Sequence, residues 1–355
     1  MATIALVAAG VIYAAVFGEA FLRLFGSRYL GEPGRSYIRP PYHYSKALGA
    51  PFRTNGWGLR GRDFREGALR IVTLGGSATE SAEVPEEESW PYRLEVELNA
   101  LGGGRPGQVA NAGMAGTASA HYLAHLNELA GPVGIDVAVI FTGINDADRL
   151  ARYGSILSVE QVGDSRYAEA LFQAFSRPDP VRLGELDSSP PVLRSRLALF
   201  LKGFGVKTVG QPLRNRLEDF VPGQSLREKR ARLRASAEYP VILSRAADDY
   251  ERNILLMIEA ARKFGVTPLF VTMPVWSEKE DPELPVLNAR LVEVCAREEA
   301  PFVDLASIKL PEGESWFGPV GHHLGKDGAA RMGKILAAAV ARLVAQETPE
   351  PSSPW

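Results

Sequence analysis

Four short segments of the sequence combine glycines with side chains that take part in acyl-transfer chemistry. A serine follows two glycines in "LGGSATES", and an asparagine and a glycine bracket "NAGMAG". A second asparagine stands in "TGIND", and two adjacent histidines begin "HHLGKDG". The residues of interest in these segments are Ser77, Gly116, Asn145, Asp146, His322 and His323. Because a serine hydroxyl is a weak nucleophile at neutral pH, it needs a neighbouring base such as one of these histidines.

The same segments offer hydrogen-bond donors for the negative charge that forms when a serine attacks a carbonyl. The candidates are the main-chain N–H groups of Ser77 and Gly116 and the side-chain amide of Asn145. Removing one such donor typically costs about 3 kcal/mol of transition-state stabilisation. A glycine at position 116 would also let the backbone approach a substrate closely. Chemistry of this kind implies neither a metal nor an organic cofactor.

These segments follow stretches whose hydrophobic pattern alternates between strand and helix. Apolar runs predict strands over residues 70–74, 108–113, 135–143, 266–274 and 301–305. Apolar residues three and four apart predict helices over 87–101, 118–130, 239–265, 284–300 and 325–345. This alternation indicates the α/β class, with three layers around a doubly wound parallel sheet of five strands. Because ligands bind at the carboxyl ends of strands in such sheets, the four segments should converge at one edge.

The remaining parts of the chain surround this pattern. The α/β domain is expected over 70–150 and 239–345, with an extended segment packed on it over 24–69. Residues 151–238 are rich in proline and then in basic residues, which predicts a helical insertion. An apolar helical stripe in the insertion fits either packing on the core or a lid that rests on anionic lipid. Residues 346–355 are expected to form a disordered tail.

The N-terminus departs from an ordinary globular composition. Ala2 to Gly18 is a run of 17 uncharged residues, and it continues past Glu19 to Leu22. This length is at the short end of what crosses a bilayer, and no cleavage site follows it. It predicts a membrane anchor helix over residues 1–23, with membrane contact through residues 2–22; a buried helix is the alternative. The arginines that follow would place that side in the cytoplasm by the positive-inside rule.

Charge and cysteine content exclude two further classes of protein. The formal net charge is −2, so the chain has no basic surplus that would favour a nucleic-acid partner. Cys295 is the single cysteine, which excludes an intrachain disulfide.

Taken together, the four segments resemble the SGNH, or GDSL-type, hydrolase family, named for Ser, Gly, Asn and His in four blocks. "LGGSATES" resembles the first block, with Gly76 where the namesake Asp often stands. "NAGMAG" resembles the second block and assigns Gly116, and "GIND" matches the G-x-N-D that assigns Asn145. The ending H-L-x-x-x-G selects His323 rather than His322. "GEAFLRLFG" and "TNGWGLRG" also resemble membrane-anchored members.

The resemblance implies a flavodoxin-like sheet and a serine ester hydrolase that works through an acyl-Ser77 intermediate. His323 would be the base, and the oxyanion hole would consist of Ser77, Gly116 and Asn145. The substrate would be a small molecule, lipid or glycan that carries an O-linked acetyl or other short acyl group. The anchored branch implies a periplasmic or extracellular catalytic domain, against the arginine count. An O-acyltransferase on a cell-envelope glycan and a non-catalytic glycan-binding protein are the alternatives.

One block departs from the family pattern. The family usually has an Asp three residues before the histidine, where this chain has Val320. The sequence therefore predicts a Ser77–His323 dyad of modest activity. Glu314 is a candidate for the missing acid, because it lies in the loop before the histidine, and Asp146 and His322 are candidates for supporting roles.

Simpler interpretations compete with each of these assignments. A serine after a strand is most often a helix N-cap, and glycines after a strand also occur in phosphate-binding loops. The phosphate loop is disfavoured, since the sequence lacks the G-x-x-x-x-G-K-[ST] spacing. His121 and His125 have metal-ligand spacing, but Tyr122 replaces the glutamate of H-E-x-x-H, so packing roles are expected.

Overall fold

The computed structural model describes residues 42–45, 50–102, 104–158, 226–276, 281–318 and 323–347, with a few positions between 10 and 20. The chain forms two compact units. The larger unit contains residues 44–52, 60–161 and 226–355, and it carries the central sheet. In the smaller unit, the Asn55 side-chain oxygen accepts hydrogen bonds from the N–H groups of Trp57 and Leu59, which closes a tight turn.

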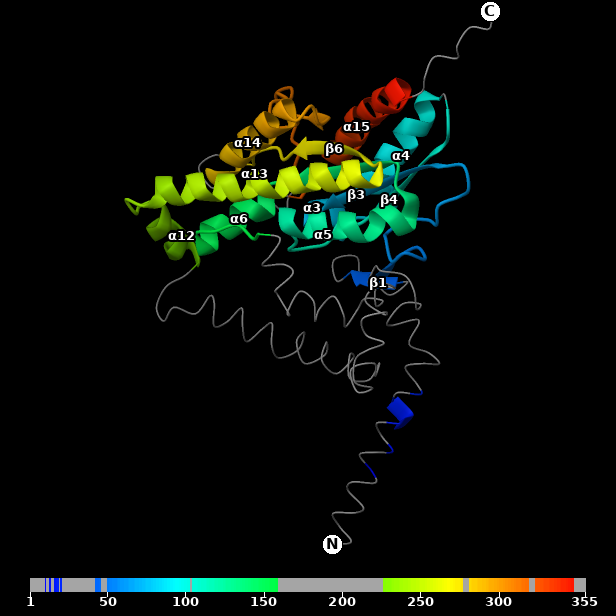
Figure 1. Ribbon diagram of the computed structural model, residues 1–355, viewed down its shortest axis with the longest axis horizontal. Helices are drawn as coiled ribbons and strands as arrows, with labels where there is room; N and C mark the ends of the chain where they lie inside the picture. Colours follow the sequence, from blue (N-terminus) through cyan, green and yellow to red (C-terminus); the bar gives the residue numbers. More distant parts are fainter. Residues whose placement is uncertain are drawn as a thin grey trace, which may run out of the picture. The chain divides into compact units, whose positions relative to one another are not determined.

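A five-stranded parallel sheet forms the centre of the larger unit (Figure 1). Its strands are β3 (Leu69–Gly75), β4 (Gly107–Asn111), β5 (Val137–Thr142), β6 (Thr267–Thr272) and β7 (Phe302–Val303). Their order is β4-β3-β5-β6-β7, which is the flavodoxin-like order of a doubly wound sheet. Every residue of β5 is buried, as expected for a strand that is covered on both faces. The predicted fold class is confirmed.

The helices lie in two layers that cover the sheet. They are α3 (Ser77–Glu80), α4 (Trp90–Leu101), α5 (Ser119–Leu129), α6 (Ile144–Tyr153), α12 (Leu226–Arg234), α13 (Tyr239–Phe264), α14 (Glu283–Arg297) and α15 (Lys326–Glu347). α4 packs against α15, whereas α13 packs against both α5 and α14. Connections between parallel strands are right-handed. A helix therefore covers one face of the sheet when the chain moves from β3 to β4, and the opposite face when it moves from β4 through β5 and β6 to β7.

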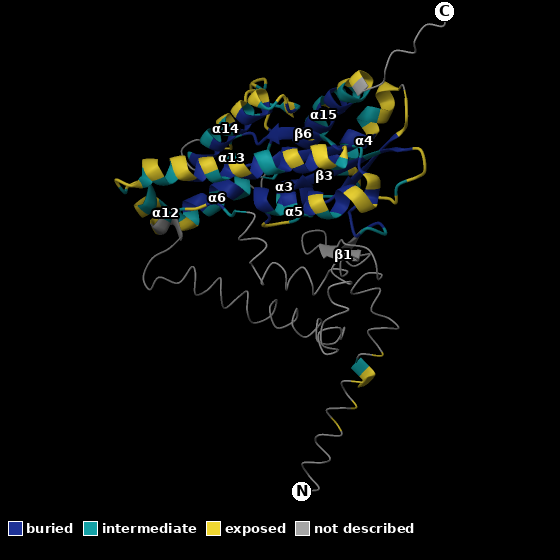
Figure 2. Ribbon diagram, viewed as in Figure 1, coloured by how far each residue is buried: buried dark blue, intermediate teal, exposed yellow. Residues whose placement is uncertain are grey.

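The long helix α13 shows how the sequence pattern determines this packing. Its buried residues recur every three or four positions, as at Tyr250, Ile254, Met257 and Ala261. Figure 2 shows the result, with buried and exposed bands alternating along α13, which runs in front of a buried sheet. The helix ends at Gly265, whose φ of 65° lies in the left-handed region that glycine adopts most easily.

Several element boundaries differ from the sequence prediction. The helix predicted over 87–101 begins at Trp90, after a 3-10 turn η1 (Glu86–Glu88), because Pro91 fits only the first turn of an α-helix. The strand predicted over 301–305 pairs only at residues 302–303. A small two-stranded sheet, β1 (Tyr42–Ser45) and β2 (Ala50–Arg53), forms within the segment predicted to be extended.

Three predicted features lie largely outside the described residues: the anchor over 1–23, the insertion over 151–238 and the tail over 346–355. Only the two ends of the insertion are described, and they contain the last turn of α6 and the helix α12. Among the helices that the structure does describe, none is both long and apolar enough to cross a membrane.

Candidate active site

Ser77 and His323 meet at the carboxyl edge of the sheet, although 246 positions separate them in the sequence. Ser77 is the first residue of α3, directly after β3, and His323 lies three residues before α15. The His323 Nε2 atom lies 3.0 Å from the Ser77 Oγ atom. When the ring carries its proton on Nδ1, Nε2 accepts a hydrogen bond from the hydroxyl. This arrangement is the one that a nucleophilic serine and its general base require.

The loop that carries His323 is held by main-chain contacts. Phe317 and Leu324 form an antiparallel bridge, and the Gly318 N–H donates to the His323 carbonyl at 2.9 Å. A Cβ atom on Gly328 would lie 1.9 Å from the Trp316 carbonyl oxygen, so only glycine fits there. This close approach explains the glycine at the end of the H-L-x-x-x-G segment.

The Gly116 loop lies beside the end of β3. Gly116 has a φ of +79°, in the left-handed region that favours glycine. The Met114 N–H donates to the Gly75 carbonyl at 2.9 Å, and the Ala115 N–H donates to the buried Glu80 carboxylate at 2.9 Å. These bonds fix the loop next to the segment that carries the serine.

Asn145 lies directly against the residue that precedes the serine. A Cβ atom on Gly76 would be only 2.1 Å from the Asn145 Nδ2 atom, so a larger residue at this position would force the Asn145 side chain to shift. The Asn145 side-chain amide donates to the Thr117 carbonyl at 2.6 Å. Ser77, Gly116 and Asn145 therefore belong to three neighbouring segments at one edge, as the strand ends predict.

Asp146 does not act at the histidine. Its carboxylate is fully buried and accepts hydrogen bonds from the Ser119 N–H at 3.1 Å and the Ser119 hydroxyl at 2.7 Å. The Asn253 amide donates to the same hydroxyl at 2.9 Å. Burial raises the pKa of Asp146 to about 6, and the Ser119 hydrogen bonds oppose that rise. The role of Asp146 in this structure is to join the start of α5 to α6.

Glu314 is also engaged elsewhere. Its carboxylate forms an ion pair with Arg331, whose guanidinium lies over the Trp316 ring at 5.8 Å. His322 lies outside the described residues, so its predicted supporting role stays a prediction. The assignment of Glu314 as the acid is therefore corrected: the contact with Arg331 occupies its carboxylate, and a different residue lies at the histidine.

That residue is Glu83, which the sequence analysis missed. Its Oε1 atom lies 3.1 Å from His323 Nδ1, on the side of the ring opposite Ser77. This contact does not have the geometry of an aligned hydrogen bond, and it becomes an ion pair when the ring takes up a second proton. The only signal in the sequence is the acidic stretch "EVPEEES" after the first block, which also reads as a solvated loop.

A cavity of about 220 Å³ opens beside the dyad. Ser77, His323 and Glu83 line it together with Val84, Leu324 and Ala329, and an ion pair of 2.8 Å between Lys326 and Glu88 lies at its margin. The volume is below the range of about 300–1,000 Å³ that is usual for sites of drug-sized ligands.

Of the two histidines on α5, His121 helps to form the start of the helix. His121 Nδ1 accepts a hydrogen bond from the Ala118 N–H at 3.2 Å, at the start of the helix. Burial and, to a smaller extent, the charge of the nearby Arg149 together lower the pKa of His121 to about 4. Within the described part of the chain, no group of three or more His, Cys, Asp or Glu side chains could hold a metal ion.

Comparison with known proteins places the chain in a family. No curated protein matches its sequence. The solved structures that are similar to it include a carbohydrate acetylesterase, Est24, from Sinorhizobium meliloti (13% identity, 77% of this chain and 99% of that chain, TM-score 0.41). They also include a lipase/acylhydrolase from Enterococcus faecalis (17%, 80% and 100%, 0.42) and the psychrotrophic esterase EstA from Pseudoalteromonas sp. (9%, 78% and 99%, 0.43). The model of the GDSL-like lipase/acylhydrolase family matches residues 73–331, which is more than half of the sequence, and the chain belongs to that family.

Proposed function

We propose that this protein is a serine esterase that removes a short O-linked acyl group, with Ser77 as nucleophile and His323 as general base. The observation that carries the proposal is the 3.0 Å contact between His323 Nε2 and Ser77 Oγ at the carboxyl edge of the sheet. Family membership supports the reaction class, since the family comprises lipases and acylhydrolases. The cavity of about 220 Å³ beside the dyad supports a short acyl group.

The reaction proceeds in two halves. Ser77 Oγ bonds to the acyl carbon while its proton passes to His323 Nε2, and the carbonyl electron pair moves onto oxygen. The N–H groups of Ser77 and Gly116 and the Asn145 amide donate to this oxyanion. Collapse breaks the bond to the alcohol oxygen, which takes the proton from Nε2. Water then attacks the acyl-serine with His323 as base, and a second collapse releases the carboxylic acid and restores the serine.

A fluorophosphonate probe and a series of p-nitrophenyl esters of increasing chain length test the proposal. We expect labelling of the wild-type protein and the highest kcat/KM for the acetyl or propionyl ester. Ser77→Ala should abolish both while changing the free energy of unfolding by only about 0.5 kcal/mol, because Ser77 is partly exposed. Ser307→Ala, which removes an exposed hydroxyl that bonds only its local turn, is the matched control.

The outcome of this experiment also separates the alternatives. A wild-type protein that is not labelled would contradict the esterase and support a glycan-binding protein. Labelling with slow hydrolysis that accelerates when an O-glycan alcohol is added would identify an acyltransferase.

The location of the enzyme is a separate part of the proposal. The apolar run over residues 2–22 supports a membrane anchor, and the resemblance to anchored members supports a catalytic domain outside the cytoplasmic membrane. The full chain should sediment with membranes and resist extraction by salt and carbonate. A reporter fused after Trp355 that is active only in the cytoplasm would contradict the proposed side.

A further inference from the structure

We propose that Glu83 is the carboxylate partner of His323, and that it replaces the acid that the family carries three residues before the histidine. This inference rests on the proposed esterase function, and it names Glu83 as a positioning residue that acts through His323. The contact of 3.1 Å between Glu83 Oε1 and His323 Nδ1 is its first basis. A proton held on Nδ1 leaves Nε2 free to accept the Ser77 proton, and the carboxylate stabilises the imidazolium that results.

The path of the chain after Ser77 brings Glu83 to this position. α3 has only four residues and ends at Ser81, where φ is 51° and ψ is 42°. A left-handed conformation is uncommon for a residue other than glycine, and within the described residues only Ser81 and Glu299 adopt it. The Ser81 N–H donates to the Ser77 carbonyl at 2.9 Å, and the Ser81 hydroxyl donates to the Ala78 carbonyl at 3.2 Å. These bonds hold the turn that directs Glu83 toward the histidine.

A buried arginine holds the main chain on both sides of Glu83. Arg60 is 2% exposed, and its guanidinium donates to the carbonyls of Glu80 at 2.8 Å, Ser81 at 2.7 Å and Val84 at 2.8 Å. The backbone of Arg60 is itself fixed by two hydrogen bonds with Asn111, the last residue of β4. Burying the charged guanidinium carries a desolvation penalty, and its hydrogen bonds to the three carbonyls offset that penalty. The same bonds fix the main chain of this short segment.

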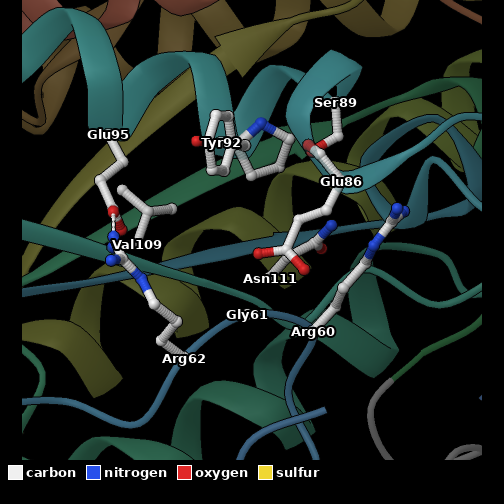
Figure 3. A pocket seen from close by; sticks show the side chains of 10 residues that line it. Arg60, Gly61, Arg62, Glu86, Ser89, Tyr92, Glu95, Val109 and Asn111 are labelled. Carbon is white, nitrogen blue, oxygen red and sulfur yellow. Dashed lines mark hydrogen bonds and ion pairs between the residues drawn. The ribbon is translucent and has the colours of Figure 1, made fainter. Parts of the chain in front are cut away.

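The surroundings of Arg60 exclude ligand binding as the reason for its burial. Figure 3 shows Arg60, Glu86 and Asn111 around a small pocket, with the Arg62–Glu95 ion pair on its far side. The pocket has about 10 Å³ of space, which is room for one water molecule at most. Arg60 therefore serves the main chain around Glu83 rather than a substrate.

Other charges near the dyad leave Glu83 available to the histidine. Among the described residues that line the cavity, Lys326 is the lysine, and it pairs with Glu88 at 2.8 Å. The side chains of Glu83 and His323 are 31% and 27% exposed, so water screens their attraction in part. For this reason we expect a smaller effect than the roughly ten-thousandfold loss of kcat that follows removal of a buried triad acid.

The test compares Glu83→Gln and Glu83→Asp with Glu87→Gln. Glu87 lies in the same acidic stretch but is exposed and does not line the cavity, so its substitution removes the same charge without touching the dyad. Glu83→Gln should lower kcat for a p-nitrophenyl ester on the order of a hundredfold with little change in KM. Glu83→Asp should recover part of the loss, and Glu87→Gln should stay within about twofold of wild type.

A spectroscopic measurement on the resting protein tests the same contact without turnover. A histidine Nδ1 proton gives a low-field proton resonance when it donates a hydrogen bond to a carboxylate, so the signal reports whether the 3.1 Å contact closes to a hydrogen bond in solution. This signal should be present in wild type and Glu87→Gln, and absent in Glu83→Gln and His323→Ala. A wild-type protein without the signal, or a Glu83→Gln variant that keeps both the signal and full kcat, would overturn the role of Glu83.

These measurements also keep the two proposals distinguishable. If wild type hydrolyses esters and Glu83→Gln is equally active, the esterase stands and only the role of Glu83 fails. If the low-field signal behaves as expected but Ser77 is neither labelled nor required for turnover, the ion pair stands and the esterase fails.

Discussion

The segment after β3 and the loop before α15 bring the two halves of the dyad together by different means. Side-chain donors from distant residues bond the main-chain carbonyls of residues 78–84: Arg60 bonds three of them, Trp90 Nε1 bonds Ala78 at 3.1 Å, and Asn111 Nδ2 bonds Thr79 at 2.7 Å. In the histidine loop, the Gly318–His323 and Gly325–Trp316 hydrogen bonds join the main chain to itself. The carboxylate that faces His323 comes from the segment with the more extensive support.

This difference suggests how the carboxylate partner of the histidine can come from different sequence positions in different members of a family. A histidine needs a carboxylate at Nδ1, but the carboxylate can come from any segment that is rigid enough to hold it there. In this chain, the segment that already positions the nucleophile and contacts the Gly116 loop through Glu80 has that rigidity. The position three residues before the histidine then does not need a carboxylate, and in this sequence it is Val320.

The largest effect in this comparison is expected on the nucleophile side, for Asn145→Ala. Loss of one oxyanion donor lowers kcat by a factor of about a hundred to a thousand. KM should change little, because the donor acts in the transition state. Steady-state kinetics with the preferred p-nitrophenyl ester would measure both. A change confined to KM would instead make Asn145 a substrate-binding residue.

Gly76→Asp, which restores the namesake residue of the first block, should harm this enzyme. The new Cβ would lie 2.1 Å from Asn145 Nδ2, so the amide has to move away from the serine. We expect a loss of kcat of at least about tenfold, and no further loss when Gly76→Asp is combined with Asn145→Ala. Additive losses in the double variant would show that Gly76 acts independently of Asn145.

Arg60→Met breaks the support of the nucleophile segment without touching the histidine loop. Three carbonyls lose a donor, which should lower the free energy of unfolding by about 3 kcal/mol. Amide hydrogen exchange should become faster at Thr79, Ser81 and Val84 and stay unchanged at Gly318 and Gly325. In a double-mutant cycle, Arg60→Met combined with Glu83→Gln should lower kcat by less than the product of the two single losses. Amide exchange that accelerates equally in both regions would contradict the comparison.

A further effect concerns the pH dependence of stability rather than the reaction rate, at Asp146. Its pKa is about 6 in the folded protein against an ordinary 3.8, so the folded state binds this proton more tightly than the unfolded state. The resulting stability is complete below about pH 3.8 and is lost as the pH rises through about 6. Near pH 8 the buried charge costs about 3 kcal/mol.

Asp146→Asn removes this titration and keeps one oxygen for the Ser119 hydroxyl. Relative to wild type, the variant should therefore be more stable at pH 8 than at pH 5. Urea unfolding at the two pH values would measure the difference. A stability difference that does not depend on pH would contradict the raised pKa.

The fold could be predicted well because its evidence is local and repeated. Each strand and helix of the sheet domain has its own hydrophobic pattern. Val137–Thr142 is a continuous apolar run, whereas the apolar residues of α13 recur every three or four positions. The convergence of Ser77, Gly116, Asn145 and His323 then follows from the rule that parallel strands end at one edge.

Glu83 could not be predicted in the same way. Its position depends on a left-handed turn at Ser81, a residue type that gives no local signal for that conformation. It also depends on Arg60, which reaches the segment from 20 to 24 positions away in the sequence. Neither feature has a period or a motif, so sequence distance alone favoured Glu314 over Glu83.

The packing of α15 against α4 has a consequence for when the enzyme becomes active (Figure 1). The proposed nucleophile, oxyanion donors and acid all lie between Ser77 and Asn145, whereas the proposed base, His323, directly precedes α15. During synthesis, a ribosome-bound chain that has already folded its first three parallel strands would hold the serine and its donors without the base. Docking of α15 would thus be a late assembly step that switches on hydrolysis, and ester turnover would report whether a newly made molecule has finished folding.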